Sequence, residues 1–117
     1  MRAAGADVVL FPSSYGTVAF PKKETDAIRD RLTCSLANTP AAFPGPSAGI
    51  HPGLTPRILE DYGRDVVINA GGGVHGHPMG SEAGAIAFRQ SIDLALGGIS
   101  PVEADVPELS SALELWG

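Results

Sequence analysis

The hydrophobic pattern divides the chain into short apolar runs separated by longer segments with helical spacing. The apolar runs are Asp7 to Phe11, a stretch ending near Ala48, and Val66 to Ala70. Such runs predict strands of a parallel sheet, and the β-branched run Val66 to Ile68 predicts a strand buried on both faces. The segments between and after them predict helices at about Lys22 to Ala37, Thr55 to Tyr62, Ser81 to Leu96 and Asp105 to Trp116. This alternation of strands and helices indicates an α/β fold.

Apolar residues that recur every third or fourth position mark the expected inner faces of the helices. These faces comprise Ile28, Leu32 and Leu36 in the first helix, and Ala85, Phe88, Ile92 and Leu96 in the third. Glycines predict helix ends, because a C-terminal cap usually needs a left-handed backbone. On this basis Gly63 ends the second helix, Gly97 and Gly98 end the third, and Gly5 caps the tail of a helix at the start of the chain.

The run Val66 to Ala70 leads directly into three consecutive glycines, Gly71 to Gly73. Glycines let backbone N–H groups turn together toward an anion, and Pro78 suits the first turn of the helix expected to follow. A second strand-to-glycine junction, Phe43 to His51, precedes the second helix. Loops at the carboxyl ends of adjacent parallel strands could share one phosphate.

Composition and charge narrow the class of protein. The 117 residues are 44% hydrophobic and 18% charged, with 15 Gly and 10 Pro, which indicates a folded but loop-rich chain. A net charge of -5 without a basic stripe argues against nucleic acid. The sequence has no run of about 18 apolar residues that would predict a membrane span, and no signal pattern. The single cysteine, Cys34, fits a reducing compartment, so a cytoplasmic location is expected.

The three histidines do not predict a metal site, because zinc usually needs three or four ligands. Two interpretations of His75 stay open: proton transfer near neutral pH, or a solvated loop position. No motif supplies a general base for a nucleophilic serine. Structural roles are therefore expected for Ser13, Ser14, Tyr15, Lys22, Lys23, Arg89 and Trp116, the last as a packing anchor.

Three segments carry a resemblance to a known family: Ser47 to His51, Gly71 to Gly80, and Gly84 to Arg89. They resemble the C-terminal part of the barrel domain in the RuBisCO large-chain superfamily. The likeness begins at Gly5 to Asp7, which is similar to the start of the sixth barrel strand. It continues through the seventh and eighth strands and ends in the family's C-terminal helical extension.

The resemblance implies a fold class and a division of the chain. Residues 1–100 would form three βα units, about strands 6 to 8 of a TIM (β/α)8 barrel, and residues 101–117 the helical extension. A complete barrel of this type needs about 250 residues, so the barrel is expected to be incomplete as a single chain.

Two departures from the carboxylase pattern lie at the reacting end of the site. Leu10 stands where the carboxylases carry a histidine, and Thr17 where their mobile loop carries a lysine. A loop insertion could instead bring Lys22 or Lys23 into play. With the residues as aligned, the chain is not expected to carboxylate. It is most similar to the non-carboxylating RuBisCO-like proteins (form IV), which enolise or isomerise phosphorylated sugar relatives.

The resemblance also implies roles for individual residues. Backbone N–H groups of Gly49, Gly71 and Gly72, with Gly73 in the same loop, would bind one phosphate. Ser47 matches the family serine that touches a substrate hydroxyl, while His51 and His77 match positions that order the loops. The carboxylases typically have an apolar residue at His75. The alternative is that these glycines only make tight βα turns.

The family places a carbamylated lysine and acidic magnesium ligands on the second barrel strand, and no segment here resembles them. Magnesium is therefore expected for the parent enzyme, and no cofactor in this chain. Three functions stay open: an enzyme assembled with a companion chain or copies of itself, a phosphate-binding module without catalysis, and a packing fragment. Open strand edges favour a homo-oligomer or association with the remainder of the barrel.

Overall fold

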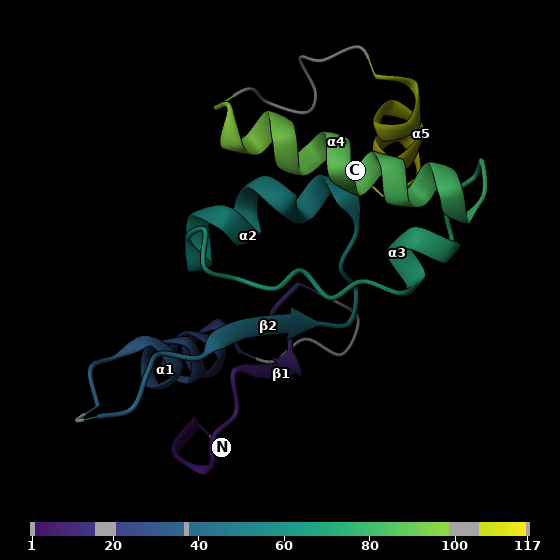
Figure 1. Cartoon of the computed structure of the whole chain (residues 1–117). Coiled ribbons are helices and arrows are strands. Elements are labelled where there is room, and N and C mark those ends of the chain that lie inside the picture. Colours follow the sequence, from purple (N-terminus) through teal and green to yellow (C-terminus); the bar gives the residue numbers. More distant parts are fainter. Residues whose placement is uncertain (1, 16–20, 37, 99–105, 117) are drawn as a thin grey trace.

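The computed structural model describes residues 2–15, 21–36, 38–98 and 106–116. The molecule is elongated, with extents of 47 × 29 × 24 Å and a radius of gyration of 14.9 Å. A compact domain of this length would have a radius of gyration of about 13 Å. In Figure 1 the strands and α1 form the lower part, and helices α2 to α5 form the upper part. The chain is therefore less compact than an ordinary domain of its size.

The N-terminal part is a βαβ unit. Its elements are η1 (Arg2–Ala4), β1 (Val8–Pro12), α1 (Lys22–Thr33) and β2 (Phe43–Ser47). The strands are parallel, with Val8 opposite Phe43 at one end and Pro12 opposite Ser47 at the other. Parallel strands need a crossover connection, which α1 provides. The predicted α/β order and the first two strands are thus confirmed.

The third predicted strand is wrong. The described residues form a two-stranded sheet, and Val66 to Ala70 is an extended segment beside β2. Val67 donates its N–H to the Pro44 carbonyl at 3.0 Å. Because Phe43 directs its N–H to the β1 side, the alternate positions, Pro44 and Pro46, face the extended segment. Proline has no N–H to donate, so the ladder cannot continue along this side of β2.

The helix boundaries follow the sequence closely in the middle of the chain. After η2 (Pro52–Leu54), α2 (Thr55–Tyr62) and α4 (Ser81–Leu96) have the predicted bounds. Gly63 ends α2 with a φ of 76°, and Gly5 follows η1 with a φ of 97°. A short helix that was not predicted, α3 (Gly72–His75), begins within the glycine triplet.

Three boundary predictions need correction. Helix α1 ends at Thr33, so Leu36 lies beyond it and is 46% exposed. Pro78 lies in a turn before α4 rather than in its first turn. Helix α5 (Pro107–Trp116) begins at Pro107, whereas Asp105 and Ala37 lie outside the described residues.

The inner face of α4 differs from the prediction except at Phe88, which is buried. Its buried residues are Ala83, Gly84, Ala87, Phe88 and Ser91. Ala85 and Leu96 are exposed, and Ile92 is half-buried. The cause is close packing: a Cβ added at Gly84 would overlap the Val74 carbonyl oxygen. A residue larger than glycine would therefore not fit at position 84, whereas Phe88 approaches α3 at Gly73.

The main hydrophobic core lies where α1, β1, β2, α2 and α4 meet. It consists of Val9, Phe11, Leu32, Ala42, Ile50, Ile58, Tyr62 and Phe88. The other face of the sheet is uncovered, with Val8 43%, Leu10 56% and Phe43 44% exposed. Within the described ranges, the helices are too short or too polar to cross a bilayer.

Candidate functional site

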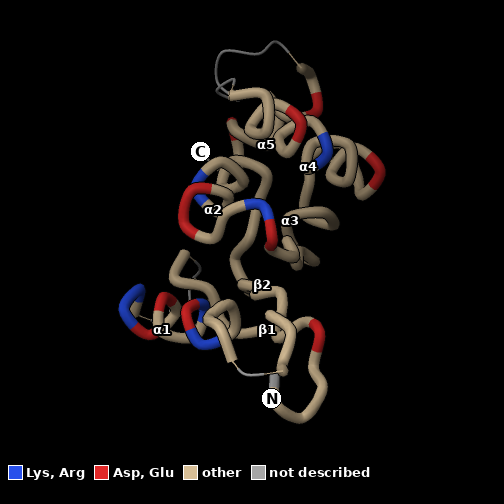
Figure 2. The backbone as a smooth tube through the Cα atoms, turned by 60° about the vertical axis from the view of Figure 1, so that its left-hand side comes forward, with Lys and Arg blue, Asp and Glu red and all other residues tan. Residues whose placement is uncertain are grey.

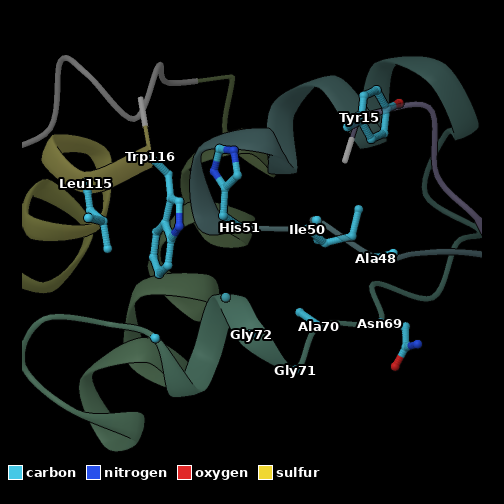
Figure 3. Close-up of a pocket in the computed structure, with 13 residues that line it drawn as sticks. Tyr15, Ala48, Ile50, His51, Asn69, Ala70, Gly71, Gly72, Leu115 and Trp116 are labelled. Carbon is cyan, nitrogen blue, oxygen red and sulfur yellow. The ribbon is translucent and has the colours of Figure 1, made fainter. Parts of the chain in front are cut away.

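A cavity of about 590 Å³ lies between two loops that contain glycines. The first loop, residues 48–51, follows β2, and the second loop, residues 69–76, contains the glycine triplet. The cavity is lined by Ala48 to His51 after β2, by Asn69 to Gly73 and Gly76, and by Tyr15, Leu115 and Trp116. Figure 3 shows His51 and Trp116 side by side above the glycine loop, with Ala48 and Asn69 to the right of the view, away from Trp116. The two loops are separated in the sequence by η2 and α2, and the structure brings them together. The positions of the two strand-to-glycine junctions predicted this arrangement.

Gly73 sets the distance between the two loops. A Cβ at this position would overlap the Ile50 carbonyl oxygen and lie 3.1 Å from the His51 Cα atom. The backbones of the two loops therefore touch at Gly73, where a side chain has no room. At Gly71 and Gly72 an added Cβ would meet nothing within 4 Å. These two glycines border open space in the cavity.

Several N–H groups of the second loop remain available to a ligand. The Gly71 carbonyl accepts hydrogen bonds from the N–H groups of Val74 and His75, each at 3.0 Å. The N–H groups of Gly71 and Gly72 precede the first bonded turn and have no backbone acceptor among the described residues. No Lys or Arg lines the cavity in the described part of the chain. An anion here would meet neutral donors.

The first loop has an unusual backbone conformation held by Ser13. Ala48 has a φ of 68° and Gly49 a φ of 71°, and the left-handed conformation is unfavourable for a residue with a Cβ. Ser13 is 1% exposed; its hydroxyl donates to the Ala48 carbonyl and its N–H to the Ser47 carbonyl, both at 2.7 Å. These bonds support the turn, which agrees with a structural role for this serine.

Ser47 lies beside the cavity rather than in its lining. Its hydroxyl donates to the Gly45 carbonyl at 3.1 Å and accepts a hydrogen bond from Asn69 Nδ2 at 2.9 Å. Asn69 is exposed and lines the cavity. Sequence reasoning missed Asn69 by assigning it to a buried strand. The available signal was a polar residue at the end of an apolar run, next to the glycines.

His51 and Trp116 form one wall of the cavity. Their rings are stacked, with centroids 5.9 Å apart and planes at 16°. Burial lowers the pKa of His51, and its Nδ1 atom is buried without a hydrogen-bond partner among the described residues. Trp116 was expected to be only a packing anchor. Its place at the end of an amphipathic helix carried no signal that this helix returns to the loops.

The other two histidines lie outside the cavity. His77 is 4% exposed; Nδ1 accepts from the Met79 N–H at 3.0 Å, so Nε2 carries the proton and donates to the Glu108 carbonyl at 2.7 Å. This neutral histidine ties its loop to α5. His75 is exposed and pairs through Nδ1 with the Ser81 hydroxyl at 3.0 Å. No contact of His75 supports proton transfer at the cavity.

Tyr15, in the loop expected to cover the substrate, lines the far side of the cavity. Its hydroxyl donates to Asp61, and the Arg57 guanidinium carbon lies 5.0 Å from the ring centroid. Burial and the Asp61 carboxylate raise the pKa of Tyr15, so its hydroxyl stays protonated at neutral pH.

Lys22 forms ion pairs with Asp26 at 3.0 Å and with Asp61 at 3.8 Å. The ammonium group of Lys22 is thus paired with these two carboxylates, and Lys22 does not line the cavity.

The two positions that distinguish the carboxylases lie apart from this cavity or outside the described residues. Leu10 is on the uncovered face of the sheet and does not line the cavity. Thr17 lies outside the described residues. The described residues also contain no group of three or more His, Cys, Asp or Glu that could hold a metal ion.

These features define an α/β protein with two glycine loops in contact around one cavity. The family described as "Ribulose bisphosphate carboxylase large chain, catalytic domain" matches residues 15–116. The chain belongs to this family, and the resemblance to RuBisCO and its non-carboxylating relatives is confirmed.

Curated relatives include the 2,3-diketo-5-methylthiopentyl-1-phosphate enolases of Bacillus cytotoxicus, 54% identical over 117 residues, and Bacillus cereus, 53% identical. The alignments cover 100% of this chain and 28% of each relative. Thus the chain spans under a third of the length of these enzymes.

Solved structures show the same fold. A rubisco-like protein (MtnW) from Alicyclobacillus acidocaldarius superposes with a TM-score of 0.92 at 46% identity, covering 100% of this chain and 30% of that protein. The octameric ribulose-1,5-bisphosphate carboxylase/oxygenase of Pyrococcus horikoshii OT3 gives 0.86 at 39% identity, covering 93% and 27%. The α/β fold is therefore that of RuBisCO large-chain segments.

Proposed function

We propose that this chain is the C-terminal part of a RuBisCO-like enolase and supplies the loops that bind the phosphate of its substrate. The observation that carries the proposal is the contact at Gly73, which holds the first loop and the N–H groups of Gly71 and Gly72 against one cavity. The relatives that are 53% and 54% identical are named as enolases of a phosphorylated diketone. We extend this class of substrate to the complete protein.

In this proposal the N–H groups of Gly49, Gly71 and Gly72 donate to phosphate oxygens, and Gly73 contributes its N–H beside them. Asn69, held by Ser47, presents a polar group to the part of the ligand next to the phosphate. His51 and His77 position the loops. Neutral donors suit this task, because backbone amides in a fixed concave arrangement bind anions without a charged side chain.

The site is proposed to be completed by protein outside this chain. Its lining holds no Lys or Arg in the described residues, and the sheet exposes Val8, Leu10 and Phe43 on one face. We assign residues 1–100 to barrel units 6 to 8 and residues 101–117 to a helical extension. The carboxyl and imidazole groups of the described residues do not fit a magnesium site. Magnesium, if the complete enzyme needs it, is proposed to belong to the remainder of the barrel.

Sulfate titration followed by amide NMR tests the phosphate assignment. We expect shifts at the N–H signals of Gly49, Gly71 and Gly72, with a dissociation constant on the order of 1 mM for a few hydrogen bonds to a dianion. Sulfate is chosen because its charge does not change near neutral pH. Chloride at equal ionic strength is the control. Shifts confined to other regions, or equal shifts with chloride, would contradict the assignment and favour a packing fragment.

The same titration should depend on pH through His51. Burial lowers the pKa of His51, so the ring is neutral at pH 7 and becomes charged only below its ordinary value of about 6.5. A bound dianion favours the charged ring and raises the pKa. Sulfate affinity should therefore increase as the pH falls through this range, and a pH-independent affinity would exclude His51 from the site.

The uncovered sheet face predicts association. We expect the chain to form oligomers at micromolar concentration by light scattering, because an unpartnered apolar face favours contact with another protein surface. Leu10→Asp should shift the population toward monomer without unfolding it, since Leu10 is 56% exposed. Leu36→Asp, at a residue 46% exposed outside the sheet, is the matched control. A monomeric wild-type chain would refute this prediction.

A further inference from the structure

The indole of Trp116 contacts both glycine loops. On one side it stacks on the His51 ring of the first loop, with centroids 5.9 Å apart and planes at 16°. Its Cζ2 atom would also lie 3.4 Å from a Cβ built at Gly76, which follows α3 in the second loop. Figure 3 shows the indole beside His51 and above the glycine loop, where it reaches the cavity from α5.

Helix α5 is fixed to the protein, so the position of this indole is fixed too. Leu109 is 0% and Ala112 1% exposed where the helix is buried. Gln90 of α4 bonds twice to α5: its Oε1 accepts from the Leu109 N–H at 3.1 Å, and its Nε2 donates to the Glu108 carboxylate at 2.8 Å. The bond from His77 Nε2 to the Glu108 carbonyl adds an anchor next to the second loop.

The His51 ring has few other restraints. Its Nδ1 atom has no hydrogen-bond partner among the described residues, so hydrogen bonding at that nitrogen does not orient the ring. The backbone after it is held from α4, where the Ser91 hydroxyl donates to the Pro52 carbonyl at 2.6 Å. The stack on Trp116 is a contact that can set the plane of this ring.

Charge does not assist in holding this region together. Figure 2 shows acidic and basic residues on α1, α2 and α4 and acidic residues alone on α5, whereas β1, β2 and α3 carry no charged residue. The two glycine loops are therefore kept in place by hydrogen bonds, such as those of Ser13 and His77, and by packing. The indole of Trp116 contributes to this packing through its stack on His51 and its approach to Gly76.

We propose that Trp116 is a positioning residue for the anion site. By stacking on His51 while packing against Gly76, it holds the two loops so that the N–H groups of Gly49 and of Gly71 and Gly72 converge on one anion. The inference rests on the proposed phosphate site. It assigns to a C-terminal helix outside the βα units a part in ligand binding that the sequence did not indicate.

The test compares Trp116→Phe with Trp116→Leu in the whole chain. Phenylalanine keeps a flat ring that can stack, whereas leucine keeps apolar bulk without one. Inorganic phosphate affinity, measured by amide NMR, should fall about three- to tenfold in the leucine variant, the range expected for one aromatic pair. The phenylalanine variant should stay within about twofold of wild type. Ile86→Ala, at an α4 residue 38% exposed, controls for loss of apolar volume elsewhere.

A second readout separates this inference from the phosphate site itself. The pKa of His51, followed by ring NMR, should rise in Trp116→Leu because the ring gains water, and should stay low in Trp116→Phe. If wild type binds no phosphate, the proposed function fails while this pKa comparison still tests the stack. Equal phosphate affinity and equal His51 pKa in both variants would overturn the inference, as would equal losses of affinity in both.

Discussion

Replacing Gly73 by alanine is expected to destabilise the chain strongly and to abolish anion binding. The added methyl would overlap the Ile50 carbonyl oxygen and lie 3.0 Å from Phe88 Cζ and 3.1 Å from the His51 Cα atom. The nearest of these atoms, the Ile50 carbonyl oxygen, belongs to the backbone and cannot rotate away. The two loops must separate, and overpacking of this kind typically costs about 1–3 kcal/mol.

Urea unfolding followed by circular dichroism measures this effect, and Gly71→Ala is the matched control. At Gly71 an added Cβ meets nothing within 4 Å, and the same methyl group is introduced only two residues away. The control should unfold close to the wild-type midpoint. If both variants unfold at the same urea concentration, the loop contact at Gly73 does not support the structure in the way described.

Replacing Gly72 by leucine is expected to leave the stability of the protein unchanged and to remove phosphate binding. Gly72 borders the cavity, and a Cβ there meets nothing within 4 Å. Its φ also lies outside the left-handed region that favours glycine. A leucine side chain can therefore extend into the space proposed for the anion. Affinity should fall at least about tenfold, which corresponds to 1.4 kcal/mol.

Phosphate titration of Gly72→Leu measures the loss, while the unfolding midpoint verifies that the fold is kept. Ala85→Leu adds the same side chain at an exposed position on α4 and should bind phosphate as wild type does. Unchanged affinity in Gly72→Leu would remove the glycine loops from the proposed function. Together the two variants distinguish the role of Gly72, which borders open space, from that of Gly73, which packs against Ile50.

Local patterns in the sequence were sufficient to predict most of the elements. Helices α2 and α4 have their predicted bounds because strong signals act within each segment, such as the glycine at position 63 that ends α2. The two glycine junctions were also correctly predicted to lie together, although the segment before Gly71 is extended beside β2 rather than a strand of the sheet. The family resemblance was carried by those same junctions.

The tertiary structure decided features that depend on residues distant in sequence. Whether Val66 to Ala70 becomes a strand depends on its partner β2, where Pro44 and Pro46 remove the donors a ladder needs. The inner face of α4 depends on the close approach of Val74 to Gly84, which hydrophobic spacing within the helix does not contain. In both cases the deciding group lies on another element.

The same distinction holds within the candidate site. The sequence by itself determined the glycine loops, because glycine and the apolar run before it are local features. Only the tertiary structure separated Gly73, packed against Ile50, from Gly71 and Gly72, which border open space. It also placed Trp116 against His51, from an element sixty-five positions later in the chain. Contacts of this range follow from how whole helices pack, so no local pattern of residues predicts them.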